Sequence, residues 1–179
     1  MSDPCVELAK QAIRSYFEQK KQISPPENIN RFLLSKRVGI FVSIHKKPKH
    51  NEKEGELRGC IGTFLPTKNC IASEIIDNAI SAATKDFRFM PIEKSELNDL
   101  EISVDELSTP EPIQSIGGLD PRKYGVIVKS EDGKTGLLLP DIEGVNDAAY
   151  QVAVAKQKAG ITPKEKIYLY RFTVIRHKE

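Results

Sequence analysis

Apolar positions follow two different periods along the chain, and each period predicts a different kind of element. A spacing of three to four residues predicts helices, and the broad apolar face of the stretch 68–85 predicts one that is buried against a sheet. Asp3 is suited to cap the first helix, because Pro4 follows it at the first helical position. The predicted helices occupy the stretch from Pro4 to the prolines at 25 and 26, a short piece at 28–35, and the segments 68–85 and 147–159.

Alternation of apolar and polar residues predicts the strands. In the strand that contains LRGCIG (57–62), Leu57, Gly59 and Ile61 are expected on one face. Glu56, Arg58, Cys60 and Gly62 are expected on the other. The remaining strands are predicted at 38–45 and 99–107, in a hairpin at 123–140, and at 167–175.

These elements mix without regular strand–helix–strand alternation, which favours an α+β fold, a largely antiparallel sheet packed with helices, over a doubly wound one. The chain has 179 residues and is expected to form a single domain, 1–179. The segment 108–121 is rich in proline and glycine and is the predicted junction between a larger and a smaller lobe.

Composition excludes several classes of function. The 27 Lys and Arg nearly balance the 25 Asp and Glu, so we expect neither a nucleic-acid nor a membrane partner. The first residues lack a signal-peptide pattern and no apolar run is long enough to span a membrane, which predicts a cytoplasmic protein. The scattered cysteines and histidines predict neither disulfides nor a metal site, and Cys5 and Cys70 are interpreted as packing residues.

The segment LRGCIG carries the first candidate chemistry. Arg58 and Cys60 are two apart on a strand, so a guanidinium on the same face could stabilise a thiolate and make it reactive. Amides from Gly59 to Gly62 could form an anion-binding nest. This face is therefore predicted to bind an anionic or carbonyl-containing small molecule. The alternative is that Cys60 is a small buried residue and that Arg58 pairs with a carboxylate nearby.

Five further residues are candidates for the same site. A nucleophilic cysteine needs a base, and His45 and Asp86 are the nearest choices along the predicted fold. Glu101 and Ser103 could line the same face, although a solvated strand face explains them equally well. Arg88 stands two residues from Asp86 in DFRF (86–89), where it could either brace the helix end or hold an anion.

Taken in order, LRGCIG, DFRF, EISV (101–104), YGVIVK (124–129), GLLLP (136–140) and KAGI (158–161) resemble the AMMECR-type domain family. The resemblance extends from about Phe32 to Phe172. It implies two unequal lobes with a cleft between them, lined by the hexapeptide 57–62. In the second motif it marks Asp86, Arg88 and Phe89.

The resemblance implies no reaction and no cofactor, because the family has no established activity. Microbial relatives are often encoded beside Memo-like and radical-SAM proteins, which are implied as pathway or complex partners. Phe87 replaces a usual proline, Asp141 replaces a common glutamine, and Lys156 stands where relatives often carry a second cysteine. A two-cysteine redox mechanism is therefore not expected. Two functions stay open: an enzyme or small-molecule-binding protein acting through Cys60, and a non-catalytic regulatory or scaffold module that binds a protein.

Overall fold

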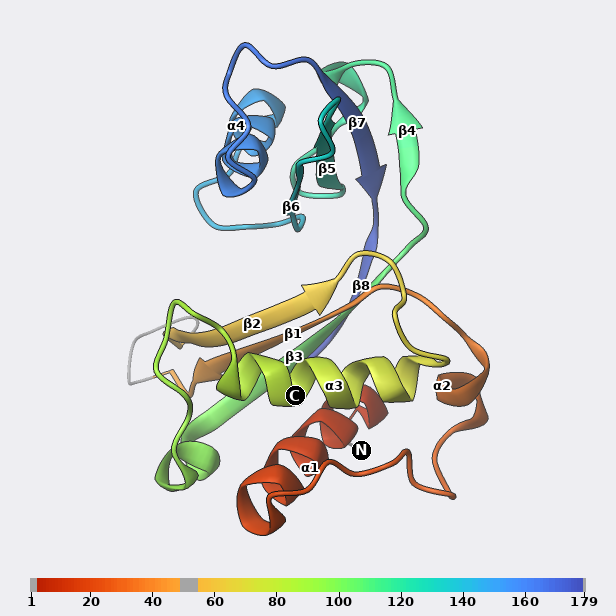
Figure 1. The fold of residues 1–179 in the computed structure, drawn as a ribbon, viewed down its shortest axis with the longest axis vertical. Coiled ribbons are helices and arrows are strands. Elements are labelled where there is room, and N and C mark those ends of the chain that lie inside the picture. The colour runs from red at the N-terminus through yellow and green to blue at the C-terminus, as the bar shows by residue number, and fades with distance from the viewer. Residues whose placement is uncertain (1–2, 49–54, 179) are drawn as a thin grey trace. The chain divides into compact units, whose positions relative to one another are not determined.

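A computed structural model describes residues 3–48 and 55–178 of the chain (Figure 1). Residues 49–54, part of the lysine-rich stretch between the strand predicted at 38–45 and the one that contains 57–62, lie outside the described residues. The chain divides into two compact units, Met1–Glu106 with Ile175–Glu179, and Leu107–Val174. Each unit has its own sheet and its own helices.

Three helices belong to the first unit: α1 (Pro4–Gln19), α2 (Arg31–Ser35) and α3 (Ile71–Thr84). Asp3 caps α1 as predicted, because its carboxylate accepts from the amides of Cys5 and Val6 at 2.8 and 3.4 Å. The predicted start of α3 at residue 68 was too early. The amide of Lys68 donates to the Glu74 carboxylate at 2.7 Å, and the helix begins only after Cys70, whose backbone is extended.

The first sheet has the strand order β2-β1-β3-β8. Its strands are β1 (Ile40–Lys46), β2 (Leu57–Thr63), β3 (Leu100–Leu107) and β8 (Val174–His177). The strand β1 pairs antiparallel with both β2 and β3. In Figure 1, α3 lies along one face of this sheet and α1 packs against α3.

The helix-facing side of the sheet forms the core of the first unit. Ile40, Val42 and Ile44 are fully buried there, as the alternation predicted. Gly59 is required at its position, because a Cβ atom would come within 2.2 Å of the Ala82 carbonyl oxygen of α3. The small residues of α3 and β2 therefore let the helix and the edge strand approach closely.

The second unit has its own four-stranded sheet, in the order β4-β7-β5-β6, with antiparallel pairs. Its elements are β4 (Glu111–Ile113), β5 (Gly125–Ser130), β6 (Thr135–Leu138), α4 (Ala148–Lys158) and β7 (Ile167–Phe172). The helix α4 packs on β5 and β6, and its C-terminal Gly160 has a positive φ of 64°, as a C′ glycine does. Short 3-10 helices, η1 (Lys94–Asp99) and η2 (Ile116–Gly118), complete the two units.

Two predicted elements differ from the structure. The segment 167–175 was predicted as one strand, yet it is interrupted at Thr173 and continues in the other sheet as β8. The backbone of Thr173 bonds to Ser108 instead, through the Ser108 amide and hydroxyl at 2.9 Å each. The short strand β4 lies within the stretch predicted as a junction. The α+β class with antiparallel sheets is confirmed. Among the described residues, no helix is long and apolar enough to cross a membrane.

Candidate functional site

The peptide groups flanking the Cys60 Cα are held by the two charged residues of DFRF. The Cys60 amide donates to Oδ2 of Asp86 at 2.8 Å, and Nη2 of Arg88 donates to the Cys60 carbonyl at 3.4 Å. The strand β2 is at the edge of its sheet, so one side of its backbone has no strand to pair with. The side chains of Asp86 and Arg88 bond to that edge in place of a further strand.

Asp86 and Arg88 also form a bidentate pair with each other. Nη2 of Arg88 lies 2.6 Å from Oδ2, and Nε lies 2.9 Å from Oδ1. The Asp86 side chain is only 3% exposed, whereas that of Arg88 is 44% exposed. The hydrogen bonds from the Arg88 guanidinium hold the pKa of Asp86 at about 2. Asp86 is thus an ionised, buried anchor, and Arg88 presents part of its positive charge to solvent beside Cys60.

The thiol of Cys60 is half-buried and accepts a hydrogen bond from Oγ of Ser43 at 3.2 Å. Ser43 is directly opposite Cys60 in the β1–β2 pair and directly opposite Ser103 in the β1–β3 pair. Ser43 lies in the strand predicted at 38–45 but was not among the predicted site residues. Cys60, Ser43 and Ser103 thus form a row of polar residues across β2, β1 and β3. Aligning the polar positions of these three strands would have identified the row from the sequence.

The remaining predicted residues of this sheet face lie in neighbouring rows. His45 is opposite Glu101, one row along from the row that contains Cys60. Gly62 is opposite Phe41, and a Cβ atom at Gly62 would come within 2.2 Å of the Phe41 ring. Glycine at position 62 therefore accommodates an aromatic ring of the same face.

Arg58 forms an ion pair with Glu96. Its Nε and Nη2 lie 2.8 and 3.0 Å from the Glu96 carboxylate, and Nη1 donates to the Met90 carbonyl at 2.6 Å. The strand register shifts at this point, so that Leu57 and not Arg58 is opposite His45. The simple alternation that put Arg58 beside the thiol therefore breaks. Glu96, which was not among the predicted site residues, holds this arginine.

The backbone amides predicted to bind an external anion are also used differently. The amide of Cys60, in the middle of the glycine-flanked run, already donates to the buried Asp86 carboxylate. The anion bound at this amide is thus a side chain of the protein itself. An external anion at this site would have to be held by side chains, of which Arg88 is the exposed cation.

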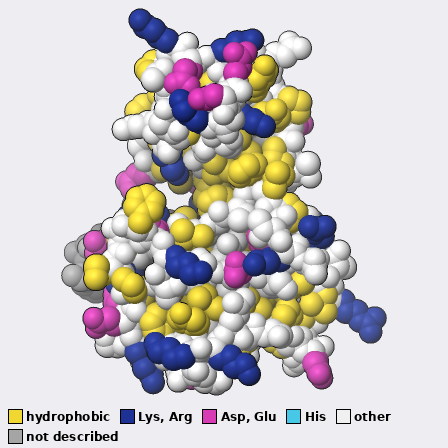
Figure 2. All heavy atoms as spheres, viewed as in Figure 1, with side chains coloured by type: hydrophobic (Ala, Val, Ile, Leu, Met, Phe, Trp, Pro, Cys, Tyr) yellow, Lys and Arg dark blue, Asp and Glu magenta, His cyan; other side chains and the backbone are white. Residues whose placement is uncertain are grey.

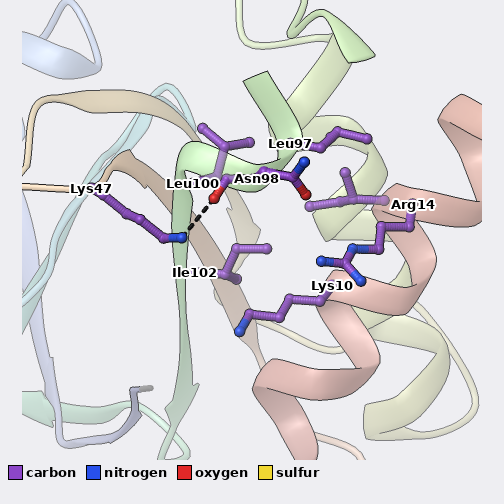
Figure 3. A pocket seen from close by; sticks show the side chains of 8 residues that line it. Lys10, Arg14, Lys47, Leu97, Asn98, Leu100 and Ile102 are labelled. Atoms are coloured by element: carbon purple, nitrogen blue, oxygen red, sulfur yellow. Dashed lines mark hydrogen bonds between the residues drawn. The ribbon is translucent and has the colours of Figure 1, made fainter. Parts of the chain in front are cut away.

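The first unit also has a small hollow of about 80 Å³ on the helix side of its sheet (Figure 3). Leu100 and Ile102 of β3 line it, together with Lys10 and Arg14 from α1. The ammonium group of Lys47 lies at the same hollow and donates to the Asn98 carbonyl at 2.6 Å. None of the predicted site residues lines this hollow.

The second unit has a larger, mostly apolar hollow of about 560 Å³ beside α4. Val152, Ile161 and Ile167 are among its lining residues, and Lys156 lies at its wall. The Lys156 side chain is buried, and its ammonium group donates to the carbonyls of Pro163 and Glu165 at 2.9 and 3.2 Å. Lys156 therefore ties the segment after α4 to the helix.

The fold and the site together define an α+β protein of two antiparallel sheets, with a cysteine on an edge strand held by an Asp–Arg pair. The chain belongs to the AMMECR1 family, whose model matches residues 6–177.

The relatives are themselves without an assigned function. A protein of Thermotoga maritima is 49% identical over 98% of this chain and 97% of its own length. A protein of Clostridium acetobutylicum is 42% identical over 99% of this chain, which spans only 36% of that longer protein. The crystal structure of the uncharacterised protein PH0010 from Pyrococcus horikoshii superposes with a TM-score of 0.87 at 30% identity, covering 96% of this chain and 88% of that one.

Proposed function

We propose that this chain binds a small anionic or carbonyl-containing molecule at Cys60, and that the thiol acts on it as a nucleophile or a direct contact. The observation that carries the proposal is the convergence of two separate segments, β1 and DFRF (86–89), on this one residue. Ser43 donates to its sulfur, Asp86 accepts from its amide, and Arg88 donates to its carbonyl. The Ser43 bond reaches the sulfur itself, and a cysteine that served only to fill space would not require it.

The electrostatics favour an anionic ligand. Asp86 is buried and already neutralised by Arg88, so the pair fixes the backbone without needing a further partner. The exposed part of the Arg88 guanidinium remains available to a carboxylate or phosphate, which guanidinium groups bind in bidentate geometry. Arg58, bound to Glu96 and to backbone carbonyls, takes a structural role in this proposal. The cleft lined by residues 57–62 stays a prediction.

His45 and Glu101 are proposed to complete the site as polar neighbours. They form a pair across β1 and β3 on the face that carries Cys60, Ser43 and Ser103. Their row is adjacent to the row of the thiol, so a bound molecule a few ångströms long would reach both rows. In this proposal His45 accepts the proton of the thiol.

The test is the pH dependence of alkylation at each cysteine in the folded chain, read by mass spectrometry. Cys5 and Cys70 are the internal references, because both are buried at 4% and 8% exposure. We expect Cys60 to react fastest, with a rate that rises clearly below pH 8.5, about the pKa of an ordinary free thiol. If Cys60 stays unreactive until the protein unfolds, the thiol is a packing group and the proposal fails.

A second candidate function is a protein-binding module, and a different observation favours it. Phe87 is 95% exposed and Met90 is 80% exposed, and both flank Arg88 in one short segment. Figure 2 shows that apolar side chains also reach the surface on the face drawn there. Fully exposed Phe and Met are typical of contact residues at protein interfaces. Under this proposal Phe87→Ser abolishes capture of the partner protein while Cys60→Ser leaves capture unchanged.

A further inference from the structure

The two ends of the described chain meet at a cluster of three side chains that the proposed function does not use. One ligand atom each from Asp3, Cys5 and His177 lies within 4.8 Å of the other two. Oδ2 of Asp3 is 2.8 Å from Nδ1 of His177. Asp3 caps α1 and His177 ends β8, so residues 174 positions apart are brought together in the first unit.

His177 is not fully satisfied by the protein. Its Nδ1 is paired with Asp3, but its Nε2 is buried and has no hydrogen-bond partner among the described residues. A buried ring nitrogen without a partner is costly, because it has lost water and gained nothing in exchange. Nε2 is therefore a buried polar atom for which the described residues supply no partner, whereas Nδ1, which faces Asp3, is the nitrogen directed at the cluster.

Cys5 is a second buried group of the same cluster. It is 4% exposed, and in the metal-free chain burial, reinforced by the charges of Asp3 and Glu106, raises the pKa of its thiol to about 12. It lies in the first turn of α1, where the helix dipole favours a negative sulfur once a cation is present. The nearby Glu106 is paired with Lys36.

We propose that Asp3, Cys5 and His177 bind a zinc ion, with water in the fourth position. Thiolate, imidazole and carboxylate are the three ligand types of protein zinc sites. With zinc–ligand bonds of roughly 2.0–2.3 Å, tetrahedral ligand atoms lie roughly 3.3–3.8 Å apart. The observed separations, from 2.8 Å to at most 4.8 Å, bracket that range, so side-chain shifts of about 1 Å suffice. The charges of a thiolate and a carboxylate neutralise the dication.

A bound zinc ion would link the start of α1 to the end of β8 and so stabilise the first unit. The sequence predicted no metal site, because no two ligands stand in a recognisable spacing and the third is at the opposite end of the chain. Only the approach of His177, at the end of β8, to the N-cap residue of α1 brings them together. This inference is independent of the proposed function at Cys60, which lies on a different face of the sheet.

Titration of the untagged, chelator-treated full chain with Co²⁺ tests the proposal, because Co²⁺ occupies zinc sites and reports its ligands spectroscopically. We expect one equivalent of Co²⁺ to produce a thiolate-to-cobalt charge-transfer band and tetrahedral visible bands, both displaced by Zn²⁺. Zn²⁺ should also raise the Tm of the wild-type chain. No thiolate band at a stoichiometric excess of Co²⁺ would overturn the proposal.

Matched variants assign the signal to this cluster. Cys5→Ser and His177→Gln should each abolish the band, and Asp3→Asn, which keeps an N-cap residue, should weaken binding by at least about 10-fold. Cys60→Ser and Cys70→Ser are the controls and should bind like wild type. A band that survives Cys5→Ser but disappears in Cys60→Ser would refute the site. Circular dichroism checks that each variant is folded. If Cys5→Ser is unstable, His177→Gln still tests the site, because His177 is partly exposed and its replacement should disturb the fold less.

Discussion

The backbone amide of Cys60 donates to a carboxylate oxygen of Asp86 at 2.8 Å, and this bond joins the two most distinctive sequence motifs of the chain. Asp86 follows directly on the end of α3, so the bond also attaches the helix end to the edge strand. The same carboxylate is bound by Arg88. Two charged side chains thus fix the position of the thiol-bearing residue.

Replacing Asp86 with asparagine should destabilise the protein in a pH-dependent way. The pKa of Asp86 falls from 3.8 to about 2 on folding, so its contribution is complete above about pH 4 and disappears as the pH falls through about 2. At about 1.4 kcal/mol per pKa unit, the fall from 3.8 to about 2 corresponds to about 2 kcal/mol, which Asp86→Asn should lose at neutral pH. Urea unfolding at several pH values measures this difference between wild type and variant.

The matched control is Asp77→Asn, which removes a partly exposed pair with Lys68 at 3.1 Å. It should change the free energy of unfolding by less than about 1 kcal/mol at any pH, as surface ion pairs do. If the free energy of unfolding changed with pH in the same way in wild type and Asp86→Asn, the charge of the Asp86 carboxylate would not stabilise the fold.

Gly59→Ala should destabilise the first unit by steric overlap alone. The added methyl group would come within 2.2 Å of the Ala82 carbonyl oxygen, a backbone atom that cannot rotate away. Overpacking of this kind costs roughly 1–3 kcal/mol and separates β2 from α3. At Gly117 an added Cβ would have no contact closer than 3.5 Å, so Gly117→Ala is the control. Equal thermal stability of the two variants would contradict the close contact.

Glu74→Gln should loosen the loop that precedes α3. The buried carboxylate accepts from the hydroxyls of Thr63 and Thr67 at 2.6 and 2.8 Å and from the amides of Thr67 and Lys68 at 2.9 and 2.7 Å. An amide side chain has one acceptor oxygen, so some donors lose their partner, at roughly 1–3 kcal/mol for each.

Hydrogen exchange at residues 67 and 68 is the measurement that locates this effect. Both amides should exchange faster in Glu74→Gln than in wild type, whereas the exposed substitution Glu18→Gln should leave them unchanged. Unchanged protection in Glu74→Gln would mean that the loop is held by other contacts.

The local elements could be predicted from the sequence because their signals are local. Asp3 and Pro4 indicate the start of α1, and Gly160 indicates the end of α4. The alternation of apolar and polar residues in 38–45 and 99–107 indicates which face of each strand is buried. The register between strands has no such signal. The shift opposite His45, which redirects Arg58 toward Glu96, depends on pairing that residue spacing does not encode.

The candidate site could be predicted only in part for the same reason. Cys60, Asp86 and Arg88 were selected because their motifs are unusual, and the structure brings them together. Ser43 is an ordinary residue in a strand, and only the three-strand row reveals its contact with the sulfur. Asp3, Cys5 and His177 gave no sequence signal of a metal site, since their proximity arises only in the folded chain.

Arg58 and Arg88 should affect the reactivity of the Cys60 thiol differently. The structure assigns the activating charge to Arg88, whereas residue spacing along the strand assigned it to Arg58. Arg88 bonds to the Cys60 carbonyl and is partly exposed beside the thiol, whereas Arg58 is bound to Glu96 and to the Met90 carbonyl. Removing the nearby positive charge disfavours the thiolate. Arg88→Gln should therefore slow alkylation of Cys60 at pH 7 by several-fold, and Arg58→Gln should leave the rate within about 2-fold of wild type while lowering Tm. Should Arg58→Gln prove the slower variant, the charge that acts on the thiol would come from the strand itself and the role proposed for Arg88 would be wrong.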